Sequence, residues 1–149
     1  MGDFRMFNIT IKTADINNAK DICKICTEDL GYPCDDSQVK ERLTKLNCER
    51  EAVFVAFINQ ILVGYIHVEK YETLYMEPMA NILGLAVKSE YQNNGIGKKL
   101  ILTAEKWALE NNIETMRLNS GSERISAHNF YRNIGYNKEK MQIRFTKKL

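Results

Sequence analysis

The chain has 149 residues, of which 44% are hydrophobic and 27% charged, as in an ordinary soluble globular protein. Lys and Arg outnumber Asp and Glu by 21 to 19, and a net charge of only +2 gives no electrostatic reason to expect a nucleic-acid partner. No apolar run approaches the roughly 18–20 residues of a membrane helix. The N-terminal Met-Gly-Asp-Phe-Arg lacks the apolar core of a signal peptide. We therefore expect one cytoplasmic domain, residues 1–149, with no membrane partner.

A short strand and two helices are predicted at the start of the chain. Isoleucines alternate with polar residues over residues 8–13, which indicates the strand. From 15 to 30 the apolar residues repeat with the period of a helix, and Gly31, followed by a proline, ends the pattern. Asp36 or Ser37 is the expected cap of the second helix. Its apolar face is formed by Val39, Leu43 and Leu46.

Residues that favour β-structure dominate from residue 52 onward. The runs 53–58 and 61–68 are separated by Asn59-Gln60, which has the length of a hairpin turn. Residues 71–79 are expected to form a loop or an irregular strand end. The run 80–87 is nearly all apolar, which predicts a central strand covered on both faces.

The last third of the chain alternates helices and strands. Apolar residues at helical spacing predict helices over 95–111 and 126–134. A strand is predicted over 115–119, and terminal strands over 136–145. This order predicts an α/β sandwich, of the α+β kind, on a mixed sheet rather than a doubly wound parallel sheet.

The connection between the 80–87 strand and the 95–111 helix contains an anion-binding pattern. Gln92-x-x-Gly95-x-Gly97 opens the helix, and Lys98 and Lys99 follow it. The first turn of a helix has about four unbonded N–H groups, and glycine lets a ligand approach the backbone closely. We therefore predict a cradle for phosphates. Neither the dinucleotide fingerprint nor the Walker loop is present, because position 100 is Leu and no G-K-[ST] follows.

Two motifs resemble those of the GNAT (GCN5-related) N-acetyltransferases. With the strand residues Leu85-Ala-Val87 before it, Gln92-Asn-Asn-Gly95-Ile-Gly97 matches the family's acyl-coenzyme A motif, Q/R-x-x-G-x-G/A. Ala127-His-Asn-Phe-Tyr131, followed by Gly135-Tyr136, matches a second element. The resemblance extends from about Ile9 to Leu149. It implies a GNAT-like, mostly antiparallel sheet with helices on both faces, acetyl-CoA as co-substrate without a metal, and acetyl transfer to a primary amine of a small molecule.

The resemblance also implies roles for individual positions. The backbone of 85–87 would pair with the pantetheine arm as an added strand does, and the amides of 92–98 would hold the pyrophosphate. Tyr131 would be the general acid, because a phenol with an ordinary pKa near 10 can donate to the departing thiolate. The alternative is that Tyr131 only packs beside Phe130. The expected cofactor-binding residues are Leu85, Ala86, Val87, Gln92, Asn93, Asn94, Gly95, Ile96, Gly97, Lys98, Asn119, Asn129 and Tyr131.

No residue stands out as the general base. Asn119 stands where some relatives have a glutamate, and an amide cannot take that role. The candidates on or just after the 61–68 run are His67, Glu69 and Glu72, of which histidine is the residue type best suited to acid–base work near neutral pH. A water chain is an equal alternative, and a structural role for His67 is another. For His128 we expect packing or a contact with the cofactor.

The acceptor side is expected in the segments 29–36 and 71–78. Their acidic and aromatic residues suit a cationic amine, or else they are ordinary surface charges. Leu30-Gly-Tyr-Pro33 and Ser120-Gly-Ser-Glu-Arg124 resemble proteins similar to aminoglycoside 6′-N-acetyltransferases. A protein or peptide amine as acceptor, a non-catalytic acyl-CoA sensor and a partner-binding domain without coenzyme A stay open as alternatives. By analogy with relatives, the terminal strands could pair in a homodimer.

The spacing Cys23-x-x-Cys26 raises the question of zinc or thiol redox chemistry. The other two cysteines, Cys34 and Cys48, do not repeat the spacing, and no histidine lies nearby in sequence. Cys23 and Cys26 also lie within the helical pattern, where a small buried thiol is common. Reduced structural thiols, with no metal, are the expectation.

Overall fold

The computed structural model describes residues 7–149; residues 1–6, on which the signal-peptide argument rests, lie outside the described residues. The chain forms two compact units, Met1–Asn119 and Ser120–Leu149. The first unit contains the sheet and three α-helices, and the second contains α4 (Ile125–Asn133) and the C-terminal segment. None of the helices within residues 7–149 is both long enough and apolar enough to cross a membrane.

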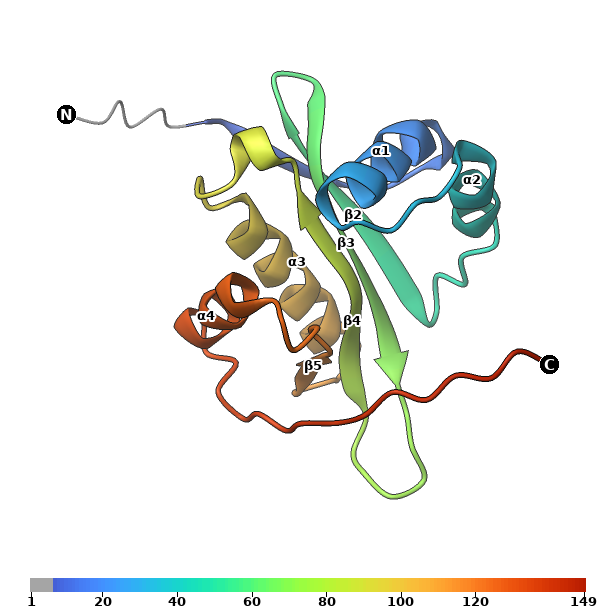
Figure 1. The fold of residues 1–149 in the computed structure, drawn as a ribbon, viewed down its shortest axis with the longest axis vertical. Helices are drawn as coiled ribbons and strands as arrows, with labels where there is room; N and C mark the ends of the chain where they lie inside the picture. The colour runs from blue at the N-terminus through green and yellow to red at the C-terminus, as the bar shows by residue number, and fades with distance from the viewer. Residues whose placement is uncertain (1–6) are drawn as a thin grey trace. The chain divides into compact units, whose positions relative to one another are not determined.

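One five-stranded sheet runs through the first unit in the order β1-β2-β3-β4-β5 (Figure 1). Neighbouring strands from β1 to β4 are antiparallel, and β5 runs parallel to β4. The mixed, mostly antiparallel sheet confirms the expected fold class. The strands are β1 (Ile9–Thr13), β2 (Glu51–Ile58), β3 (Ile61–Tyr71), β4 (Met79–Val87) and β5 (Met116–Leu118).

The β2–β3 hairpin forms at the predicted two-residue turn. Asn59 and Gln60 have φ values of 48° and 68°. Positive φ at both central residues gives the turn whose twist matches that of the paired strands, and Asn tolerates this conformation well. The turn therefore forms without a glycine.

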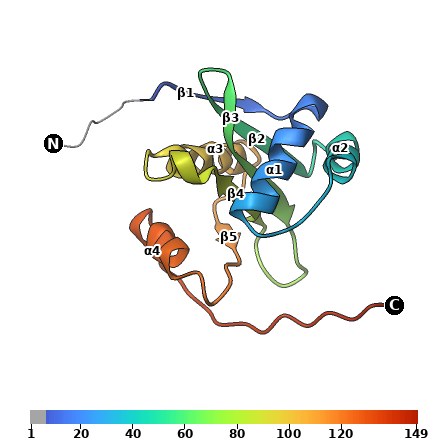
Figure 2. The same cartoon turned by 45° about the horizontal axis from the view of Figure 1, so that its top comes forward.

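Helices cover both faces of the sheet (Figures 1 and 2). Two helices, α1 (Ala19–Asp29) and α2 (Asp36–Thr44), lie side by side on one face, and a 3-10 turn (Ile16–Asn18) precedes α1. Ile22 and Ile25 of α1 pack there into a buried cluster with Val53 and Val55 of β2. The other face is covered by α3 (Ile96–Glu110), whose buried side chains recur at helical spacing: Ile96, Leu100, Ile101, Ala104 and Ala108.

Two details of these elements differ from the prediction. The cap of α2 is Asp35, not Asp36 or Ser37, because Asp35 has extended backbone angles and accepts a 2.8 Å hydrogen bond from the amide of Gln38. β4 is not covered on both faces along its whole length. Leu83 is 49% exposed, because it lies beyond the stretch that pairs with β5 and borders an open groove.

The prediction of terminal strands over 136–145 is wrong. Within residues 7–149, no strand follows Leu118. Met141, Ile143 and Phe145 supply the alternating pattern, but each is more than three-quarters exposed. Alternation indicates a strand with one buried face, but within residues 7–149 these side chains are not buried and no strand pairs with the segment.

Candidate functional site

The start of α3 leaves backbone amides open. Gly95 is the N-cap, with a left-handed φ of +80°, and no side chain caps the helix. The amide of Lys99 donates the first helical bond, to the carbonyl of Gly95, so the amides of 96–98 have no acceptor within the helix. Residues 92–95 are exposed, whereas the side chain of Ile96 is buried. The turn therefore offers its backbone, and not the Ile96 side chain, to an anion.

Two polar side chains hold the loop before α3 in shape. The amide group of Gln92 donates to the carbonyl of Val87 at 3.1 Å, across the short 3-10 turn Ser89–Tyr91. That of Asn94 donates to the carbonyls of Tyr91 and Gln92, at 3.0 Å each. These side chains are thus occupied within the loop, and Asn93 adds a second left-handed residue with φ 64°. The groups left without a bond within the helix are the amides of 96–98 at the start of α3.

β4 has a free edge directly before this loop. Its pairing with β5 covers only Ala80–Ile82, opposite Met116–Leu118. From Gly84 to Val87 it pairs with β3 on one side, while on the other side the described residues supply no strand; Leu83 lies at a shift in the β3–β4 register. The backbone of Leu85 and Val87 can therefore bond to an extended ligand laid along this edge. Ala86 contributes backbone only, because its side chain is 5% exposed and belongs to the core.

A groove of about 350 Å³ opens on the face of the sheet that α1 and α2 cover. The strands supply Val53, Tyr65, His67, Leu83 and Gly84, and the other lining residues come from α1, α2 and the segment that follows each helix. A Cβ at Gly84 would lie 2.9 Å from the Tyr65 hydroxyl, so glycine makes room for that ring. Because Leu83 and Gly84 belong to the free stretch of β4, the groove reaches the strand that leads to the cradle.

Of the candidate bases, only His67 lines the groove. Its Nε2 lies 2.8 Å from Oε1 of Glu51, and both side chains are about one-fifth exposed, at 21% and 19%. Sequence reasoning missed Glu51. The signal that could have found it is the register of the β2–β3 hairpin. His67 pairs with Val53, and Glu51, two residues before Val53, shares a face of β2 with it.

The two glutamates after His67 are engaged elsewhere. Glu72 lies 3.4 Å from the guanidinium of Arg50 on the surface. Glu69 accepts a 3.1 Å hydrogen bond from the buried Asn81. Neither residue lines the groove.

Asn119 belongs to a polar network at the start of β4. Its Oδ1 accepts from Arg117 at 3.3 Å, and the same guanidinium donates to Asn81 at 2.8 Å. Arg117 also lies over the ring of Tyr71, 4.3 Å from its centroid. This network satisfies the buried amide of Asn81, which is a structural task.

In the second unit, Tyr131 lies among aromatic rings. Its ring centroid is 5.2 Å from that of Phe130 and 6.0 Å from that of Tyr136. Burial raises the pKa of Tyr131, and the positive charge of Arg124 opposes that effect more weakly. The phenol therefore stays protonated at neutral pH.

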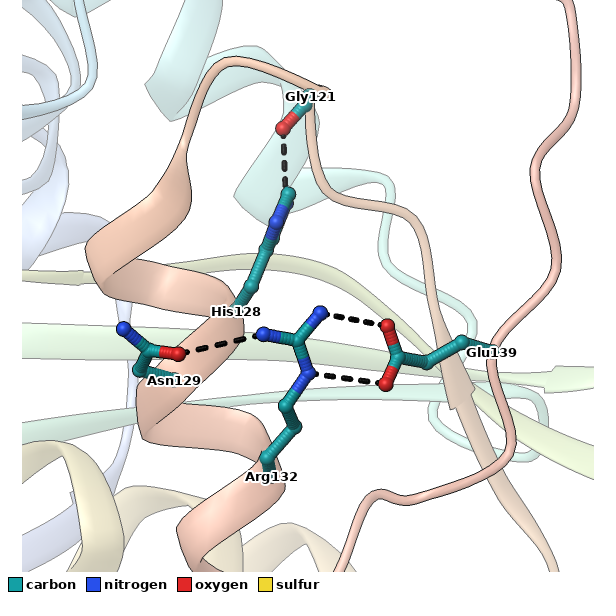
Figure 3. Close-up of polar contacts among 5 residues, drawn as sticks. All are labelled: Gly121, His128, Asn129, Arg132 and Glu139. Carbon is teal, nitrogen blue, oxygen red and sulfur yellow. Dashed lines mark hydrogen bonds and ion pairs between the residues drawn. The ribbon is translucent and has the colours of Figure 1, made fainter.

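Three other polar residues of α4, His128, Asn129 and Arg132, bond within the second unit (Figure 3). Nε2 of His128 lies 2.9 Å from the carbonyl of Gly121. Asn129 accepts from Arg132 at 3.2 Å, and Arg132 makes a two-pronged ion pair with Glu139, at 2.9 and 2.6 Å. His128 thus ties the 120–124 turn to α4 and has a packing role.

All four cysteines are free thiols. Sγ of Cys23 lies 3.2 Å from Sγ of Cys34, and Sγ of Cys26 lies 3.1 Å from the Tyr65 hydroxyl. Burial, helped by Cys34 and Asp36, raises the pKa of Cys23 to about 12. Among residues 7–149 there is no group of three His, Cys, Asp or Glu side chains arranged to hold a metal ion.

Comparison with known proteins agrees with the sequence motifs. The family model described as "Acetyltransferase (GNAT) family" matches residues 19–136. A streptothricin acetyltransferase of Escherichia coli is 31% identical over 88 residues, which cover 59% of this chain and 48% of that protein. The aligned part thus spans about half the length of that relative.

Solved acetyltransferase structures share the fold. One is an aminoglycoside acetyltransferase, meta-AAC0020, from an uncultured soil metagenomic sample, in complex with trehalose; its TM-score is 0.78 at 24% identity, over 95% of this chain and 96% of that one. Another is AAC(6')-Iy in complex with the bisubstrate analog CoA-S-monomethyl-acetylneamine, with a TM-score of 0.81 at 15% identity, over 95% and 99%. At these identities the likeness concerns the fold.

Proposed function

The chain belongs to the GNAT family of acetyltransferases, and from that premise we propose that it transfers an acetyl group from acetyl-CoA to a primary amine of a small molecule. One observation carries the proposal. The uncapped, exposed start of α3 follows the free edge of β4 after a short turn. An anion cradle and an edge for an extended arm are the two features that coenzyme A requires of a protein.

The residues present fit coenzyme A. When bound, acetyl-CoA supplies an acetyl group activated as a thioester. The amides of 95–98 would hold the pyrophosphate, with Lys98 and Lys99 adding positive charge beside it. The backbone of Leu85 and Val87 would bond to the pantetheine arm. The side chains of Gln92 and Asn94 would act by shaping the loop.

Tyr131 is our proposed general acid. A proton donor must be protonated at the working pH, and burial keeps the pKa of Tyr131 above its ordinary value. The Tyr131 hydroxyl would give its proton to the thiolate that leaves the acetyl group.

His67 is our proposed general base, positioned by Glu51. The amine acceptor arrives protonated and must lose a proton before it reacts. His67 lines the groove, and its Nε2 contacts Glu51 at 2.8 Å. The carboxylate would orient the ring and stabilise the imidazolium that forms when His67 takes up the proton.

The first test is turnover of an amine panel with acetyl-CoA, measured by the release of free thiol.

The binding test compares Gly97→Val with the matched control Leu102→Val, a change at an exposed position of the same helix. We expect Gly97→Val to weaken coenzyme A binding more than tenfold, because its side chain would obstruct the cradle, and Leu102→Val to leave it unchanged. Equal affinity in both variants would remove the cradle from the proposal.

The general acid is tested with Tyr131→Phe. We expect kcat to fall by roughly 10²-fold, within the usual range for an acid–base group, with coenzyme A binding kept. Tyr136→Phe, which removes a hydroxyl from the neighbouring ring, is the matched control. A wild-type kcat for Tyr131→Phe would exclude the phenol from proton transfer.

A further inference from the structure

We propose that the acceptor is an amine with an apolar body and a single anionic end, such as a carboxylate, and that Arg42 binds that end. The inference rests on the proposed acetyl transfer and names the chemical class of its acceptor. It concerns the groove between the sheet and the two helices, α1 and α2.

The lining of the groove is apolar and lacks carboxylates. Among the described residues that line it, none is Asp or Glu. The helical side and the loops beside it contribute Ile22, Leu30, Val39, Leu43 and Leu46, with Tyr32 and Pro33 at one margin. An apolar wall stabilises an apolar ligand body, whereas each ammonium of a polycation would need an acidic partner when it leaves water.

Carboxylates near the groove are occupied in the fold. Asp29 accepts hydrogen bonds from the amide and hydroxyl of Ser89. Asp35 caps α2, and Glu51, which does not line the groove, contacts His67. Asp29 and Asp35, two of the acidic residues that sequence reasoning assigned to a cationic acceptor, are therefore engaged within the fold, and neither lines the groove.

Arg42 is the permanent charge of the groove lining. It lies on α2 and is exposed, and no carboxylate within residues 7–149 pairs with it. A guanidinium presents a planar fork that matches a carboxylate with two parallel hydrogen bonds. It also repels an acceptor that carries several ammonium groups.

The sheet side and the helix side of the groove carry different polar groups, and this assigns the direction of the ligand. His67 and Gly84 lie on the sheet side, where Gly84 belongs to the free stretch of β4. Arg42 lies on α2, which packs on α1. An acceptor with its amine at His67 and its anionic end at Arg42 would therefore lay its apolar body along the wall of α1 and α2.

Steady-state kinetics with matched amines tests the proposal. The probes are 4-(aminomethyl)benzoate, benzylamine, which lacks the carboxylate, and sisomicin as a polycation. We expect the wild type to favour 4-(aminomethyl)benzoate over benzylamine by roughly tenfold in kcat/KM, the effect of one exposed charged hydrogen-bond pair. Arg42→Gln should remove that preference through KM and leave benzylamine unaffected, and Arg42→Lys should restore part of it.

Lys40→Gln is the matched control, since it removes the same charge from α2 outside the groove lining. It should keep the wild-type preference. Preference for sisomicin, or a carboxylate preference that survives Arg42→Gln, would overturn the inference while acetyl transfer stands. If no turnover is found, calorimetry measures whether 4-(aminomethyl)benzoate still binds in the presence of coenzyme A. Binding that depends on Arg42 without turnover would uphold the acceptor class and contradict the proposed transfer.

Discussion

At the scale of single residues, the buried thiol of Cys23 in α1 differs from an exposed thiol in its reactivity toward alkylating agents. Cys23 is 6% exposed, and burial raises its pKa to about 12. Only the thiolate reacts with an alkylating agent, so at pH 8 roughly one Cys23 thiol in 10⁴ is reactive. We predict that iodoacetamide labels the exposed Cys48 in the native protein and leaves Cys23 unlabelled until the chain is unfolded. Mass spectrometry of the labelled peptides measures both, and native labelling of Cys23 at the rate of Cys48 would contradict the prediction.

The His67–Glu51 pair allows a second test at the residue scale. His67→Gln should lower kcat by roughly 10²-fold, and the defect should shrink as rising pH deprotonates the free amine. Glu51 acts through His67, so Glu51→Gln should cost less, about tenfold, and nothing further once His67→Gln is present. Glu114→Gln, at an exposed site in the loop after α3, is the control. Additive losses in the double variant would show that Glu51 acts independently.

At the scale of elements, the packing of α3 on the sheet depends on Gly64. A Cβ at Gly64 would lie 2.9 Å from the carbonyl oxygen of Ala86 and 3.2 Å from Cδ1 of Leu100. That carbonyl belongs to β4, which pairs with β3, so the two strands would have to shift and the Leu100 side chain of α3 would have to give as well. We predict that Gly64→Ala costs about 1–3 kcal/mol in the free energy of unfolding by urea. Leu102→Ala, at a half-exposed site on α3, should change it by less than about 1 kcal/mol. An unchanged midpoint for Gly64→Ala would refute this account of the packing.

Elements with a strong local signal were predictable from sequence. The apolar stripe of α3 and the turn at Asn59-Gln60 depend on spacing within a few residues, and both formed as predicted. The pattern over 136–145 had the same local quality, but a strand also needs a partner strand, which periodicity cannot report. The parts of the candidate site were likewise predictable only where a local motif marked them. A motif located the loop before α3, whereas Glu51 and the apolar groove arise from strand register and helix packing between distant segments.

For the molecule as a whole, β4 connects the two proposed binding sites of the first unit, the groove and the α3 cradle. Its stretch from Leu83 to Val87 borders the groove at one end and leads into the α3 cradle at the other. A chain with a net charge of +2 does not attract anions through its overall field. Under the proposed function, affinity for the pyrophosphate would therefore come from the local amides of the cradle.

Thermal unfolding with acetyl-CoA tests that argument on the intact protein. Ligand at 100 times its Kd adds about 2.7 kcal/mol to the stability of the folded state, which for a chain of this size raises Tm by roughly 5–10 °C. Acetyl-pantetheine lacks the pyrophosphate and, at equal concentration, should give a much smaller rise because it reaches only the β4 edge. Gly97→Val should reduce the rise with acetyl-CoA toward that of acetyl-pantetheine. Equal rises for the two ligands would mean that the start of α3 does not hold the pyrophosphate, and no rise at millimolar acetyl-CoA would contradict the acetyl transfer itself.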